Sequence, residues 1–145
     1  MALKVELKPG ERIILGECVI TNDSQRTRLF IEGDAPILRE KDILTPETAD
    51  TPAKRVYFAV QLMYLENNVD AHADRFLQLS QDFMTAAPSS AGIIERINNK
   101  ILTSDLYKAL REAKALISHE EERLRDAKFS GSSLRTDETK NSSAT

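Results

Sequence analysis

The sequence predicts an α+β protein in which a small antiparallel β meander precedes a helical region of about four helices. In the first 44 residues, apolar side chains alternate with polar ones or form short runs bounded by turn residues. From residue 45 onward, apolar residues recur every three or four positions, as in amphipathic helices. The boundary falls within residues 28–44, where the turn-forming residues 33–36 end the last long strand.

This pattern divides the chain into a small β module (residues 1–44), a helical region (residues 45–129) and a disordered tail (residues 130–145). The tail is assigned from its composition, which shifts to Ser, Thr, Gly and charged residues. A sheet as small as the β module buries too little surface to be stable alone. We therefore expect it to pack on the helices or on a second copy, and we predict a homodimer.

Turn residues separate the strands of the β module. Pro9 and Gly10 form one turn signal, and the polar residues 22–25 form another. The predicted strands cover residues 3–7, 13–15, 18–21, 26–32 and 37–39.

The helical region has recognisable starts and breaks. Thr51 and Pro52 are typical of a helix N-cap and first turn, and Asn67 with Asn68 weakens the helical pattern. Residues 88–92 break it again. The last helix has a short coiled-coil-like seam formed by Leu106, Leu110, Ala113, Ile117 and Leu124. Leu116 lies outside this seam, and we expect it to be exposed.

Composition excludes several classes of protein. The 145 residues include 20 Lys and Arg, 23 Asp and Glu, and one Cys, with a net charge of −3. No segment is strongly basic, so a nucleic-acid site must be a local patch. No signal peptide or membrane-spanning segment is evident, so we expect a cytoplasmic protein without a membrane partner.

Catalytic and metal-binding patterns are also lacking in the sequence. His72 and His119 have no neighbouring His, Cys or spaced carboxylates, and the five glycines form no phosphate-binding loop. We therefore predict a protein that is not an enzyme and that uses no metal and no cofactor.

A basic and aromatic strand face is the main candidate for function. Strand alternation places Arg26 and Arg28 on one face together with Phe30. Two guanidinium groups beside an exposed ring suit single-stranded RNA, in which bases stack and phosphates pair with cations. In the alternative interpretation, Phe30 packs on a helix and the arginines pair with nearby acids. Arg39, just past the turn, is a further candidate cation.

Three long segments resemble the FlbT family of flagellum-biosynthesis regulators: ALKVELKPGERIILGECVI, RLFIEGDAPILREKDIL and TPETADTPAKRVYFAVQLMYL. The resemblance covers residue 2 to about residue 128. It implies a post-transcriptional regulator, usually a repressor, that associates with the 5′ untranslated leader of flagellin mRNA. The expected effect is on the stability or translation of that messenger.

The first 44 residues also resemble the small RNA-binding regulators of the CsrA type, in residues 9–16, the Ala-Pro pair at 35–36 and the Arg-Glu pair at 39–40. By this resemblance Arg39 matches the arginine after the Ala-Pro turn. Lys8 matches the second of two basic residues that end the first strand. The resemblance implies a CsrA-like β module that grips RNA through its first and last strands.

The expected RNA-binding residues are Arg39, Arg28, Arg26, Lys8 and Arg12. The alternative function is a helical protein-interaction module that binds flagellin or another flagellar regulator and affects the messenger indirectly. A charge placed on an exposed apolar helical position, with Leu116→Glu as the first trial, would test that alternative.

Overall fold

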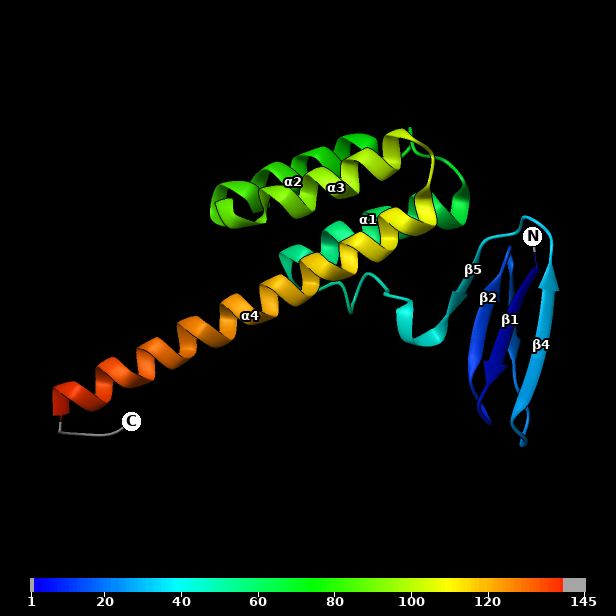
Figure 1. Ribbon diagram of the computed structural model, residues 1–145, viewed down its shortest axis with the longest axis horizontal. Helices are drawn as coiled ribbons and strands as arrows, with labels where there is room; N and C mark the ends of the chain where they lie inside the picture. The colour runs from blue at the N-terminus through cyan, green and yellow to red at the C-terminus, as the bar shows by residue number, and fades with distance from the viewer. Residues whose placement is uncertain (1, 140–145) are drawn as a thin grey trace.

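The computed structural model describes residues 2–139, with side chains for residues 3–127, and consists of a β module followed by four α-helices (Figure 1). This is the predicted α+β arrangement. The described elements are β1 (Ala2–Leu7), β2 (Arg12–Leu15), β3 (Cys18–Thr21), β4 (Thr27–Glu32), β5 (Ile37–Arg39), the short 3₁₀ helix η1 (Glu40–Asp42), α1 (Pro52–Glu66), α2 (Ala73–Ala86), the 3₁₀ helix η2 (Pro88–Ser90), α3 (Ala91–Leu102) and α4 (Leu106–Thr139).

The strand order differs from the predicted meander. β1 pairs with β4 in one two-stranded sheet, and β2 lies between β3 and β5 in a second sheet, with all pairs antiparallel. Of these pairs, β2 and β3 alone are consecutive in the chain. The hairpin between them turns at Gly16, whose φ of +63° suits the tight turns that match strand twist.

The split into two sheets has a physical reason in the apolar residues. Val5, Leu7 and Ile13 are buried together, with half-buried side chains from β3 and β4 packed against them. A flat meander would leave this apolar face open to water, whereas two stacked sheets enclose it. β1 and β2 therefore belong to opposite layers of a small sandwich.

The helix boundaries follow the predicted capping signals. The Thr51 side chain accepts a hydrogen bond from the Lys54 backbone amide at 3.2 Å, and Pro52 occupies the first turn of α1. α1 ends at Asn67, which adopts the left-handed conformation with φ of 50°. Helices α1 to α4 share one apolar core, which also includes Leu38 from β5.

The buried stripe of α4 is wider than the predicted seam. Leu116 is 0% exposed, so the expectation that it lies on the surface is wrong. Leu124, assigned to the seam, is 61% exposed. The reason is that α4 packs against both α1 and α3, which buries a broader face than a two-helix seam would.

The last helix runs into the segment predicted to be a disordered tail, and the disorder of that tail stays a prediction. α4 continues to Thr139 and so covers residues 130–139 of the segment expected to be disordered. Extending a helix that already exists adds one hydrogen bond per residue without a new nucleation cost, so α4 can extend past its packed part. Residues 140–145 lie outside the described residues.

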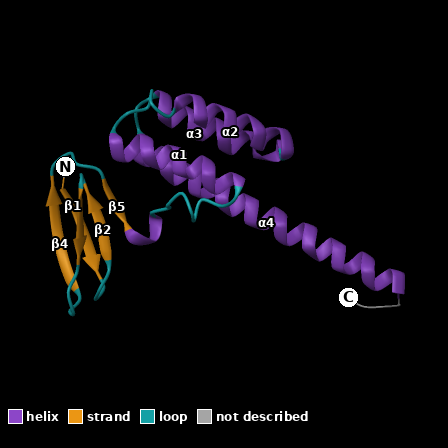
Figure 2. Cartoon of the chain, turned by 180° about the vertical axis from the view of Figure 1, so that it is seen from behind, coloured by secondary structure: helices purple, strands orange, loops and turns teal. Residues whose placement is uncertain are grey.

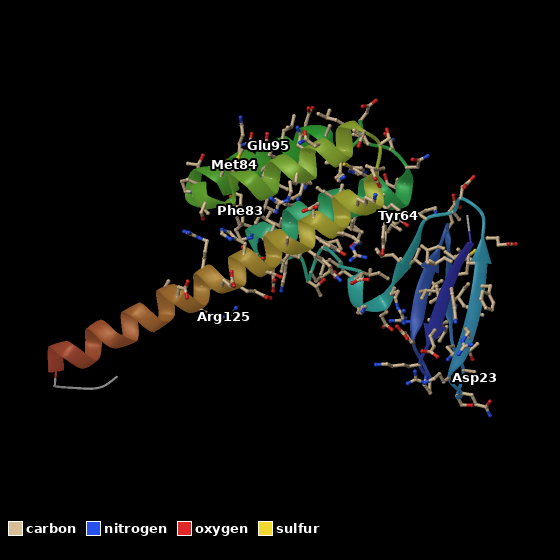
Figure 3. The ribbon with its side chains drawn as sticks, viewed as in Figure 1. Asp23, Tyr64, Phe83, Met84, Glu95 and Arg125 are labelled. Atoms are coloured by element: carbon tan, nitrogen blue, oxygen red, sulfur yellow. The ribbon has the colours of Figure 1, made fainter. Side chains whose placement is uncertain are left out.

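Three side chains of α1 join the helical region to the β module by binding backbone groups of the connecting segment. The Tyr64 hydroxyl accepts from the Ile37 amide at 2.9 Å and donates to the Ile37 carbonyl at 3.0 Å. Gln61 bonds both backbone groups of Leu44, and the Tyr57 hydroxyl donates to the Asp42 carbonyl at 2.6 Å. Figure 3 labels Tyr64 at this junction.

The Tyr64 bonds satisfy both backbone groups of Ile37, the first residue of β5, and the other two side chains hold the segment that follows the strand. The β module therefore completes its packing partly on the helices of its own chain. The small size of the sheet therefore does not by itself require a second copy of the chain. The homodimer stays a prediction.

Candidate nucleic-acid interface

One face of the β1–β4 sheet is polar, exposed and directed away from the core. In β4 the exposure alternates, with Arg28, Phe30 and Glu32 exposed and the intervening residues half-buried. The register pairs Lys4 with Phe30 and Glu6 with Arg28. We call this surface the outer face; it consists of Lys4, Glu6, Arg26, Arg28, Phe30 and Glu32.

Phe30 is the most prominent side chain of the outer face. It is 72% exposed and does not pack on a helix, contrary to one of the two interpretations of the sequence. In both views of the ribbon, β4 lies on the side of the β module away from the helices (Figures 1 and 2). An exposed ring flanked by cations offers a planar surface for stacking.

The two arginines of the outer face share one carboxylate. Glu6 lies 3.5 Å from a guanidinium nitrogen of Arg26 and 3.9 Å from one of Arg28. All three side chains are more than half exposed. Exposed pairs of this kind contribute about 0–1 kcal/mol, so the arginines remain able to exchange Glu6 for another anion.

Lys8 lies at the end of the same face. β1 ends at Leu7, which pairs with Thr27, and Lys8 follows in the turn, where its backbone amide donates to the Glu11 carboxylate at 2.9 Å. The outer face holds three cations against two carboxylates, and Lys8 adds a fourth cation at its edge. The chain as a whole has a charge of −3, so this is a local basic patch.

Arg12 and Arg39 belong to the other sheet. Arg12 pairs with Glu40 at 3.1 Å on the exposed surface. Arg39 pairs with Glu11 at 2.9 Å and also donates to the Glu6 backbone carbonyl at 2.6 Å. The structure thus brings Arg26 and Arg28 together on one carboxylate and leaves Arg12 apart from them, whereas Lys8 and Arg39 both lie near Glu11.

Arg39 links the two sheets. It pairs in register with Ile13, and paired residues project to the same side of a sheet, so Arg39 lies on the side that faces β1. A hydrogen bond from the Lys8 backbone amide and the guanidinium of Arg39 lower the pKa of Glu11. The side chain of Arg39 is 34% exposed, against 57% for Arg28. Arg39 is therefore mainly held inside the module.

Sequence reasoning missed Lys4 and Glu6 as members of the site. The alternation of Lys4, Glu6 and Lys8 along the first strand was visible, but the predicted meander placed that strand beside the second one. The register with β4 sets Lys4 across from Phe30 and Glu6 across from Arg28. The missing information was the strand pairing.

Both histidines pair with neighbouring side chains. His72 bonds Glu66 at 2.8 Å, and His119 bonds Ser89 at 3.0 Å. Among the side chains described, no group of three or more His, Cys, Asp or Glu is placed to hold a metal ion. Within the described residues, no helix is long and apolar enough to cross a membrane.

The fold and the outer face define an α+β protein that presents a basic and aromatic strand surface beside a four-helix region. Comparison with known sequences identifies its family. The family described as flagellar protein FlbT matches residues 3–124, and the chain belongs to this family. The resemblance to the FlbT family, predicted from the sequence, is confirmed.

Several curated relatives are similar over most of their length. A probable flagellum biosynthesis repressor protein FlbT 1 of Bradyrhizobium diazoefficiens is 61% identical over 122 residues, which cover 83% of this chain and 84% of the relative. A probable flagellum biosynthesis repressor protein FlbT of Rhodopseudomonas palustris strain TIE-1 is 56% identical, covering 86% and 98%. The flagellum biosynthesis repressor protein FlbT of Caulobacter vibrioides strain ATCC 19089 is 35% identical, covering 86% and 90%. No solved structure matches the fold significantly.

Proposed function

We propose that this protein is a post-transcriptional regulator of flagellum synthesis that binds the 5′ untranslated leader of flagellin mRNA through the outer face. Its relatives are named flagellum biosynthesis repressors, which supports a role in regulating flagellum synthesis, with repression as the expected sign. It acts as a binding protein and not as an enzyme. The finer part of the proposal, direct contact with RNA, rests on the outer face.

The observation that carries the proposal is the exposed Phe30 beside Arg28 and Lys4. A phenylalanine that is 72% exposed on a strand contributes little to the stability of the fold, because most of its ring stays in water. Single-stranded RNA uses such rings, since an unpaired base stacks on the ring while cations on the same face pair with phosphates. Lys4 and Arg28 lie on the sheet beside this ring.

Replacing both Arg26 and Arg28 with alanine is expected to weaken binding of a flagellin leader transcript about tenfold or more, because the variant cannot form two charge-assisted hydrogen bonds to phosphate. The slope of log affinity against log salt should flatten by about 0.7 for each phosphate that the variant no longer pairs with. The measurement is fluorescence anisotropy of the labelled transcript with purified protein alone, at several salt concentrations.

The matched control removes two arginines from the helical surface. Arg75 on α2 and Arg111 on α4 are exposed, so their double alanine variant has the same net charge as the test variant. This control should bind like the wild type. Equal losses of affinity in both double variants would show a non-specific charge effect and would remove the outer face as the site.

The second candidate function is a helical protein-interaction module that binds flagellin or another flagellar regulator. A groove of about 370 Å³ between α1, α2 and α4 favours it, because Leu79, Phe83 and Leu124 give it apolar walls. Leu116 is not suitable for testing this alternative, since it lies in the core.

Leu124→Glu is the appropriate variant, because Leu124 lines the groove and is 61% exposed. If the groove binds the partner protein, this charge should abolish control of flagellin levels in cells. It should leave RNA binding and thermal stability unchanged. If the outer face is the working surface, as we expect, Leu124→Glu should keep flagellin control and the Arg26/Arg28 variant should lose it. Immunoblotting of flagellin in strains carrying each variant makes the measurement.

A further inference from the structure

The outer face has a geometry that specifies the form of RNA it accepts. We propose that β4 binds an unpaired stretch of RNA along its length, with one base on Phe30 and successive phosphates on Arg28 and Arg26, and that Glu6 is the anion which this RNA must displace. The inference rests on the proposed function and adds to it a substrate form and a residue that sets the affinity.

The spacing of the three side chains supports a single extended strand. Arg28 and Phe30 are two positions apart in β4, so their side chains are separated by about 6.6–6.8 Å along the strand, and Arg26 lies just before the strand begins at Thr27. Stacked nucleotides in a duplex rise about 3.4 Å each, and an unstacked strand is stretched well beyond that. One nucleotide per two strand residues therefore suits an unstacked, extended segment.

The exposure of Phe30 indicates an unpaired base. A base inside a helix is covered on both faces by its neighbours, so its ring cannot stack on a side chain without leaving the helix. Phe30 projects from a flat sheet as a single ring, and its cross-strand neighbour Lys4 is a flexible cation. Duplex RNA would meet only the cations of this surface and would gain no stacking.

Glu6 controls how strongly the cations alone attract phosphate. Its carboxylate lies 3.5 Å from Arg26 and 3.9 Å from Arg28, and Glu6 pairs in register with Arg28. A phosphate that reaches either arginine comes close to this negative charge and is repelled by it. Binding by phosphate contacts alone is therefore weak, and the stacking on Phe30 becomes decisive. Glu6 thus lowers the affinity for both forms of RNA, and only the unpaired form regains affinity by stacking a base on Phe30.

Glu6→Gln tests this role because glutamine keeps the size and the hydrogen-bonding oxygen but removes the charge. We expect this variant to bind a mixed-sequence oligoribonucleotide of about eight nucleotides about fivefold more tightly than the wild type. It should also bind the same sequence as a duplex more tightly. Phe30→Ala should lose affinity for the single strand and keep the weak affinity for the duplex.

Glu32→Gln is the matched control, because Glu32 is exposed on the same face but pairs in register with Ala2 and not with an arginine. It should change affinity less than Glu6→Gln. Thermal unfolding at the wild-type temperature verifies that each variant is folded.

The outcomes separate this inference from the proposed function. If the wild type binds the oligoribonucleotide but Glu6→Gln binds no more tightly than Glu32→Gln, the role of Glu6 is refuted and the outer face can still be the site. If Phe30→Ala binds the single strand as well as the wild type does, the arrangement along β4 is wrong. If neither the wild type nor Glu6→Gln binds RNA at low salt, the proposed function itself fails.

Discussion

Replacing Leu116 with glutamate is expected to unfold the helical region at ordinary temperatures. Leu116 is 0% exposed and belongs to the core shared by all four helices. An unpaired charge forced into such a core costs several kcal/mol, which is comparable to the roughly 5–15 kcal/mol that stabilises a whole domain. Circular dichroism during heating measures the effect, and the cooperative helical transition of the wild type should be lost.

Two companion variants establish that burial is the cause. Leu116→Ala should keep the fold but lower the free energy of unfolding by about 2–5 kcal/mol, because it leaves a cavity. Leu124→Glu places the same charge on the same helix at a position that is 61% exposed, and it should unfold like the wild type. A Leu116→Glu protein with wild-type stability would contradict the position of α4 in the core.

The contrast between Leu116 and Leu124 shows that apolar periodicity predicts the position of a helix in the chain but not which of its residues are buried. The spacing of apolar residues located the last helix correctly. It could not predict which of two adjacent apolar stripes on that helix is buried. The neighbouring helices determine which stripe is buried. α4 contacts α1 and α3 along its first half, and its second half extends past them (Figure 1). Which stripe is buried therefore depends on tertiary packing, which one helix cannot encode by itself.

Glu120 illustrates the same limit for a charged residue. The run of three glutamates at 120–122 is typical of a solvated helix face, and Glu121 and Glu122 are indeed exposed. Glu120, however, is 9% exposed, and its carboxylate accepts a hydrogen bond from the Ala53 backbone amide at 3.0 Å. It satisfies a free amide at the start of α1, 67 residues away in sequence. Such a long-range cap leaves no local sequence signal.

In the β module, alternation predicted which side chains face outward but not which strands are neighbours. The outward positions of Arg28 and Phe30 followed from the period of two alone. The neighbours Lys4 and Glu6 depend on the pairing of β1 with β4, which joins residues more than 20 positions apart. The arginines pair with an acid, as the alternative interpretation expected, whereas Phe30 is exposed and does not pack on a helix as that interpretation also expected. The RNA platform stays a prediction.

Replacing Arg39 with alanine is expected to loosen the β module. Its guanidinium donates to the Glu6 backbone carbonyl at 2.6 Å and to the Glu11 carboxylate at 2.9 Å, so it joins β5 to β1 and to the turn before β2. The bond to the Glu6 carbonyl alone is of a kind that contributes about 1.5–3 kcal/mol. The change is measured by native-state hydrogen exchange. The β1 and β2 amides should lose protection from exchange, and the α1 amides should keep theirs.

Glu11→Gln separates this structural role from direct contact with RNA, because it breaks the ion pair and keeps the charge of Arg39. If Arg39 acts as a link between the sheets, both variants should lower amide protection, and both should bind RNA normally at temperatures where they are folded. If Arg39 itself grips RNA, Arg39→Ala should weaken binding and flatten the salt slope, whereas Glu11→Gln should not weaken it.

The pH dependence of the module gives an independent test of the same link. The folded-state pKa of Glu11 is lowered, first by the Lys8 amide and then by Arg39, so the folded state binds a proton less readily than the unfolded state. Its stabilisation is fully present above the ordinary pKa of glutamate, about 4.3, and is lost as the pH falls through the lower folded-state value. Amide protection of β1 should therefore decline in acid more steeply in the wild type than in Glu11→Gln. Equal acid sensitivity in the two proteins would show that the Glu11 carboxylate, with its bonds to the Lys8 amide and to Arg39, does not stabilise the module.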